Sequence, residues 1–295
     1  MLKATTSLLI TAYDEWRADG APQIAAALTY YTLLSVAPLL VLLVGVAGRS
    51  LGSEDAAERL LEQAYTLAGP LGVQVAAELL AAAQPTTMST AASVLAGVIA
   101  TLGAMRVFRQ LRFAFDRMWD IPPEEPPGDS ITDQVRSALS ALGRHNLAAF
   151  AMLVAVGVML IASVALSSAM TVAADTLAPH LAISTSALRT VESAVSLLLV
   201  TALFAIVYRY LPRTRIGWTD VLVGAAITAG LFTVGRLLLG LYFTNASPGS
   251  AYGAAGSVVA LLVWVNFSSQ LMLYGAEFTH VWTYTHGSRS SGGAG

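Results

Sequence analysis

Long apolar stretches dominate this sequence and limit its possible folds more than any other feature. A helix needs about 20 largely apolar residues to cross the hydrocarbon of a membrane, and six stretches meet that requirement. None of them alternates polar and apolar residues as a strand of a membrane barrel does. We therefore predict an all-α, polytopic membrane protein with six transmembrane helices. The predicted spans are residues 23–47, 88–105, 147–169, 191–208, 220–243 and 256–275.

The low charge content supports this prediction. Only 12% of the residues are charged and 56% are hydrophobic, whereas an ordinary soluble domain is about 25% charged. This composition argues against a soluble enzyme, and the net charge of −2 gives no sign of a nucleic-acid-binding surface. Because the chain has no cysteine, it has no disulfide, thiolate metal site or cysteine nucleophile.

The distribution of arginine and lysine predicts the orientation, because these residues concentrate in cytoplasmic loops. With the N-terminus inside, 12 of the 16 basic residues are cytoplasmic, three are outside, and Arg236 lies within the fifth span. We expect a protein of the inner (cytoplasmic) membrane with both termini in the cytoplasm.

The segments between the spans differ in kind. Residues 5–19 are predicted to form an amphipathic helix that lies in the membrane interface. Residues 50–87 contain spaced acidic residues and read as a small helical cap outside the membrane. We interpret residues 1–286 as one membrane domain and the Ser/Gly-rich residues 287–295 as a flexible tail. The apolar face of the interfacial helix is Leu8, Leu9, Ala12 and Trp16.

A basic amphipathic helix is predicted from Arg106 to Trp119, directly after the second span. One interpretation is a docking site for anionic lipid headgroups. The other is an ordinary anchor under the positive-inside rule. The candidate headgroup ligands are Arg106, Arg109 and Arg112, and the apolar face is Phe108, Leu111, Phe115 and Met118.

The sequence contains no nucleotide-binding loop and no hydrolase or metalloprotease motif. Its four histidines fall on opposite sides of the membrane in the predicted topology, so we expect no shared metal site and no cofactor. Gly249, Gly253 and Gly256 are interpreted as a tight turn between the fifth and sixth spans rather than as a phosphate loop. We do not expect the protein to be an enzyme. The histidines are His145, His180, His280 and His286.

Polar residues inside the predicted spans are the candidate functional sites, because they are costly in a membrane. Tyr30 belongs to a polar part of the first span, and Asn266, Gln270 and Glu277 share one face of the last helix by their spacing. This face could line a path for a polar solute or lipid headgroup. Alternatively, the amides bond neighbouring helices.

Two further expectations concern contacts of these spans. We expect Glu277 to meet Arg209 or Arg213, or a hydroxyl of the first span, and so close the cytoplasmic end; the alternative is a solvated glutamate. Gly224 and Thr228 are interpreted as a surface for close helix packing.

Four strings resemble the YihY/virulence factor BrkB family, whose members are often labelled ribonuclease BN. They begin at Ala25 (AAALTYYTLLS, followed by APLL), Tyr208 (YRYLP), Tyr252 (YGAAGS) and Tyr274 (YGAE). The resemblance implies a bacterial inner-membrane protein with six spans, but no catalytic residues that could be carried over. The nuclease label conflicts with the short cytoplasmic segments, which lack clusters of metal ligands.

These observations favour a membrane protein that transports or organises an envelope lipid or small polar solute. A scaffold for other envelope proteins is the alternative, and a ribonuclease fits least well. The expected partners are membrane lipids and not nucleic acid.

The sequence also predicts a contact between Arg236 and Glu192. Both lie about 24 Å from the cytoplasmic ends of the fifth and fourth spans, and an unpaired charge at that depth costs a few kcal/mol. Alternatively, both side chains reach separately to the outer interface. We expect Arg236→Ala and Glu192→Ala each to lower the free energy of unfolding, and the double variant to cost less than their sum. Strict additivity in denaturant unfolding would contradict the contact.

Overall fold

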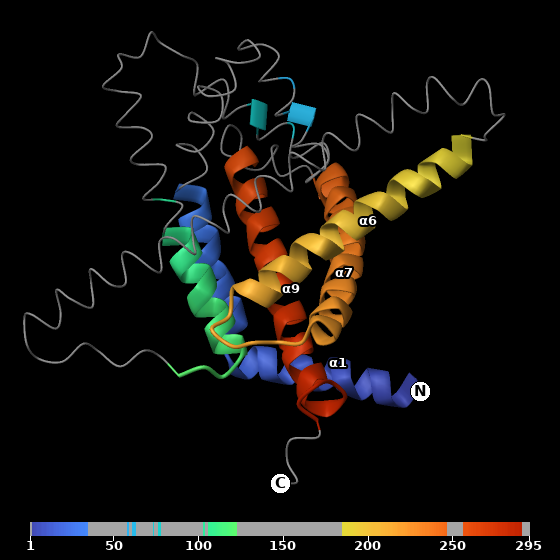
Figure 1. Cartoon of the computed structure of the whole chain (residues 1–295). Helices are drawn as coiled ribbons and strands as arrows, with labels where there is room; N and C mark the ends of the chain where they lie inside the picture. Colours follow the sequence, from blue (N-terminus) through green and yellow to red (C-terminus); the bar gives the residue numbers. More distant parts are fainter. Residues whose placement is uncertain are drawn as a thin grey trace, which may run out of the picture.

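The computed structural model describes residues 2–34, 58, 61–62, 73, 76–77, 103, 106–122, 185–246 and 256–290. Within these ranges the chain forms helices and turns and contains no strand, as the all-α prediction expects. Helical segments also cover residues 21–34 and 106–118. The four labelled helices in Figure 1 are α1 (Leu2–Ala18), α6 (Thr185–Tyr210), α7 (Trp218–Ala246) and α9 (Gly256–Thr285).

Three of these helices are long and apolar enough to cross a membrane. The qualifying stretches are Ser193–Tyr210 in α6, Trp218–Phe243 in α7 and Val258–Thr285 in α9. They correspond to the fourth, fifth and sixth predicted spans, although α9 continues well past the predicted end at residue 275. The first predicted span begins in segment 21–34. The remainder of that span, nearly all of the second and the whole of the third lie outside the described residues.

Helix α1 runs across the end of α9 in Figure 1. Leu8 and Ala12 are buried and pack with Phe278 and Val281 of α9. The predicted apolar face is thus occupied by protein, except for Leu9, which is 37% exposed. This packing accounts for the amphipathic pattern, and a position in the membrane interface stays a prediction.

Helices α7 and α9 pack through a reciprocal pair of glycines and threonines. Thr228 lies where a side chain at Gly275 would otherwise be, and Thr279 occupies the same position against Gly224. Each threonine hydroxyl donates to the carbonyl of the glycine four residues earlier in its own helix, at 2.7 Å. Small residues let the helix backbones approach closely, so the prediction of a packing surface at Gly224 and Thr228 is confirmed.

Tyr208 of α6 joins this contact. Its hydroxyl lies 2.9 Å from Thr228 Oγ1 and donates to the Met272 carbonyl of α9, also at 2.9 Å. The ring is buried against Phe115 of segment 106–118. Tyr208 of α6 therefore contacts α7, α9 and segment 106–118.

The predicted apolar face of segment 106–118 belongs to the core. Phe115 and Met118 are fully buried, and Phe108 and Leu111 pack against the same cluster. The segment is held by Asp116, whose carboxylate accepts hydrogen bonds from Arg213 Nε at 2.7 Å and from the Arg213 backbone N–H at 3.1 Å. A buried apolar face with an ion pair to the α6–α7 loop fixes this segment against the bundle.

The first residues of the predicted flexible tail are also anchored. The Ser288 hydroxyl and backbone N–H both donate to Asp220 Oδ2, at 2.7 and 3.0 Å. Arg289 donates to the Thr214 hydroxyl and to the Arg215 carbonyl. Residues 287–290 are therefore bound to the α6–α7 loop and the start of α7, while residues 291–295 lie outside the described part.

Substitution at Gly275 tests the packing of α7 on α9. A Cβ atom there would overlap Thr228 and the Tyr208 hydroxyl, and overpacking of this kind costs about 1–3 kcal/mol. We expect Gly275→Ala to lower the free energy of unfolding in detergent by about 1–3 kcal/mol.

Gly230→Ala is the matched control, because a Cβ atom at Gly230 of α7 has nothing within 4 Å. Alanine is a better helix former than glycine by about 1 kcal/mol, so this variant should be neutral or more stable. Equal effects of the two substitutions would contradict the close contact.

Candidate functional site

A cleft of about 510 Å³ lies between segment 21–34, α7 and α9. Its wall is mainly apolar, with polar groups supplied by Thr29 and Tyr30 on one side and by Asn266 and Gln270 on the other. Three of the residues predicted from sequence, Tyr30, Asn266 and Gln270, thus come together here. The apolar lining residues are Ala26, Leu239, Leu262, Val263 and Phe267.

The helical spacing of α9 explains how its amides reach the cleft. Asn266 and Gln270 are four residues apart and therefore lie on the same face of the helix. The Gln270 amide donates to Asn266 Oδ1 at 2.5 Å. This bond uses one donor and one acceptor lone pair of the two amides. The remaining amide hydrogens and the Gln270 oxygen are chemically able to bond a polar group in the cleft.

The two sides of the cleft differ in how their polar atoms are bonded. The Thr29 hydroxyl donates to the Ala25 carbonyl of its own helix at 2.7 Å. Tyr30 is 58% exposed and packs edge-on against Tyr31. An exposed phenol beside a cleft offers both an aromatic face and a hydroxyl. The site can accordingly bind an amphipathic molecule through apolar contact and neutral hydrogen bonds.

Glu277 lies apart from the cleft, at the end of α9 that α1 covers. Its side chain is buried, and Oε1 is 3.2 Å from Nδ1 of His280. The expectation that Glu277 meets Arg209 or Arg213 is wrong, because Arg213 pairs with Asp116 and Arg209 stacks over the Trp218 ring. In the described part of the first span, residues 23–34, no hydroxyl bonds Glu277, whose Oε1 is bonded by His280 instead.

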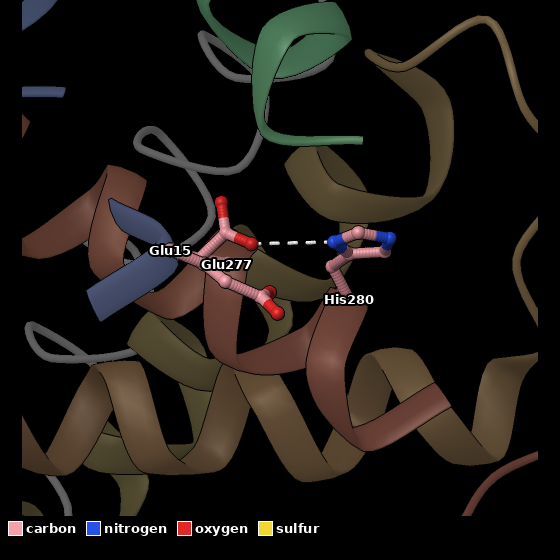
Figure 2. Close-up of side chains that lie close together, drawn as sticks. All are labelled: Glu15, Glu277 and His280. Carbon is pink, nitrogen blue, oxygen red and sulfur yellow. Dashed lines mark hydrogen bonds and ion pairs between the residues drawn. The ribbon is translucent and has the colours of Figure 1, made fainter. Parts of the chain in front are cut away.

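The carboxyl group of Glu15 from α1 completes a cluster with Glu277 and His280, which Figure 2 shows. One ligand-type atom from each residue lies within 4.8 Å of the others. Asp19, at the end of the α1 region, pairs with Arg117 at 3.4 Å. Burial raises the pKa of the Asp19 carboxyl, although Arg117 opposes that shift.

The remaining predicted residues lie elsewhere. Arg236 is half-buried on α7, which packs against α6. The side chain of Glu192 lies outside the described part of the structure, so their contact stays a prediction. Arg106 and Arg109 are exposed, while Arg112 lies with its guanidinium 5.5 Å from the centroid of the Phe108 ring. Their role as headgroup ligands likewise stays a prediction.

Glu15 and His280 are not among the site residues predicted from the sequence. One signal was available, because Glu277 and His280 form a Glu-x-x-His pair, a spacing that metal-binding helix bundles use. No local pattern indicated Glu15, which comes from the other end of the chain. Only the packing of α1 across α9 brings it to the pair.

Known proteins resemble this chain in sequence. A UPF0761 membrane protein of Glaesserella parasuis is 34% identical over 80 residues, which cover 27% of this chain and 28% of the relative. A UPF0761 membrane protein of Psychromonas ingrahamii is 40% identical over 77 residues, covering 26% of each chain. One of Neisseria meningitidis serogroup B is 26% identical over 280 residues, covering 95% of this chain and 63% of the relative.

The matched region therefore spans less than two thirds of each of these relatives. No solved structure matches the chain. The sequence profile described as "Virulence factor BrkB" matches residues 12–294, nearly the whole chain. Together with the membrane-type helices, this match establishes that the chain belongs to the Virulence factor BrkB family of membrane proteins.

Proposed function

We propose that this protein binds an amphipathic envelope lipid or a small polar solute in the cleft between segment 21–34, α7 and α9, and moves it through the membrane. The observation that carries the proposal is the composition of the cleft wall, in which neutral polar side chains lie among apolar ones. A volume of about 510 Å³ falls within the range of small-molecule sites.

The chemistry of the wall favours a neutral or amphipathic occupant. Amides and a phenol provide hydrogen bonds but no compensating charge, and the lining residues contain no ionisable acid or base other than the Tyr30 phenol. Acyl chains or other apolar groups would contact the leucine, valine and phenylalanine side chains. Without a nucleotide-binding motif in the sequence, movement would be passive, coupled to an ion, or driven by a partner.

A scaffold without transport is the second candidate function. It is favoured by the exposed Arg106 and Arg109, which are available to anionic lipids or acidic partners.

Under either function, we propose that the protein has no enzymatic role and no part in RNA cleavage. We also propose that the chain lies in the inner membrane with six spans. In this topology α1 lies at the cytoplasmic interface and both termini are inside.

Flux through reconstituted vesicles tests the transport proposal. We expect purified protein in proteoliposomes to accelerate the exchange of a fluorescent phospholipid between leaflets, or the release of a small polar solute, above the rate in protein-free vesicles. Val263→Trp should reduce the rate at least tenfold, because the larger side chain would fill the cleft.

Val234→Trp is the control, because Val234 is exposed on α7 and is not part of the cleft. It should leave the flux unchanged. No flux of either probe, with both variants folded, would favour the scaffold, and equal losses in both variants would remove the cleft from the proposal.

Thiol labelling tests the proposed orientation. The chain contains no cysteine, so single cysteines can be introduced without background. Cysteines replacing Ser53 and Ser247 should react in intact cells with a reagent that cannot cross the inner membrane, whereas one replacing Ser130 should react only after permeabilisation. Labelling of the Ser130 position in intact cells would reverse the orientation.

A further inference from the structure

We propose that Glu15, Glu277 and His280 bind one divalent transition-metal ion, which fastens α1 to the end of α9. The site is separate from the cleft, and the proposal does not depend on transport. Its donor set consists of two carboxylates and one imidazole, drawn from two helices that meet only in the folded protein.

The spacing within α9 suits joint ligation. Glu277 and His280 are three residues apart and project from the same face of the helix. A Glu-x-x-His pair combined with a single glutamate from another helix is half of the donor set with which helix bundles hold two metal ions. Here α1 supplies that single glutamate because it crosses α9 at this level (Figure 1).

The distances are close to those that a metal needs. Two ligands bound to one zinc ion at about 2.1 Å lie at most about 4.2 Å apart. The three candidate ligand atoms already lie within 4.8 Å of one another. Glu15 is exposed, so its side chain is able to rotate inward by the small remaining distance.

A buried oxygen in the cluster lacks a partner. The Glu277 side chain is only 1% exposed, and His280 bonds Oε1, but Oε2 has no hydrogen-bond donor. An unsatisfied buried carboxylate oxygen is costly. No arginine or lysine in the described part of the chain forms an ion pair with Glu277. A cation between the carboxylates and the imidazole would resolve both deficits.

The surroundings hold the ligands and attract a cation. The His280 ring packs against Trp119 with centroids 5.1 Å apart and against Tyr284 at 4.9 Å. These contacts fix the imidazole ring. Figure 2 shows that its Nδ1 is directed at Glu277. Asp19 and Asp120 add negative charge near the cluster. The imidazole is thus oriented before an ion arrives, and only the exposed Glu15 has to turn inward.

The donor types indicate the class of ion. Imidazole favours zinc, iron, nickel and copper over magnesium and calcium, while carboxylates accept all of them. A site with one nitrogen and two carboxylate oxygens should therefore prefer Zn²⁺ to Mg²⁺. With Glu15 exposed, water would occupy any remaining position on the ion.

Zinc binding to the full chain tests the proposal. The protein is purified without a polyhistidine tag, stripped with EDTA, and titrated with ZnCl₂ in detergent by calorimetry. We expect one ion per chain, with binding retained in excess Mg²⁺. Glu15→Gln and His280→Asn should each weaken binding at least tenfold. Because Glu15 is exposed, its variant should fold even where Glu277→Gln does not.

Asp14→Asn and His286→Asn are the matched controls, since each removes the same donor type from an exposed position outside the cluster. Both should bind zinc as the parent protein does. Absence of saturable zinc binding would overturn the proposal. Equal affinity in Glu15→Gln and Asp14→Asn would overturn it as well, because the ion would then be bound elsewhere.

Discussion

The close contact between α7 and α9 is the constraint on which the rest of the described structure depends. In a membrane, apolar side chains gain little by leaving lipid for protein, so helices associate through tight packing and hydrogen bonds. Gly224 and Gly275 permit that packing, and the opposing threonines fill the space. The threonine hydroxyls bond within their own helices, so they add no unsatisfied polar group to the interface.

Tyr208 depends on that contact in turn. Its hydroxyl reaches Thr228 and the Met272 carbonyl only because α7 and α9 lie close together. Its ring then supports Phe115, and through it the segment 106–118. The neighbouring Asp116 is bonded to Arg213 in the loop that follows α6. Segment 106–118 and the α6–α7 loop are therefore positioned by contacts with the helix pair.

The sequence predicted the features that depend on local patterns. The apolar runs of α6 and α7, the amphipathic face of α1 and the Gly224–Thr228 packing surface all follow from periodicity and residue size. The pairing of Asp116 with Arg213 and the approach of Glu15 to Glu277 could not be predicted in this way, because they depend on contacts between distant segments. The predicted sixth span, residues 256–275, is shorter than α9, which continues to Thr285, because the packing of α1 on this end depends on a distant segment. Polar residues after 275 read as the end of a span, yet α1 covers them.

The polar residues of α9 change in kind along the helix. Neutral amides, at Asn266 and Gln270, occupy the part of the helix that borders the cleft. The ionisable pair, Glu277 and His280, lies near the end, where α1 and Trp119 cover it. A charge costs far more than an amide in an apolar environment. This order keeps the ionisable pair out of the cleft and in a protein-covered position, where each group is the partner of the other.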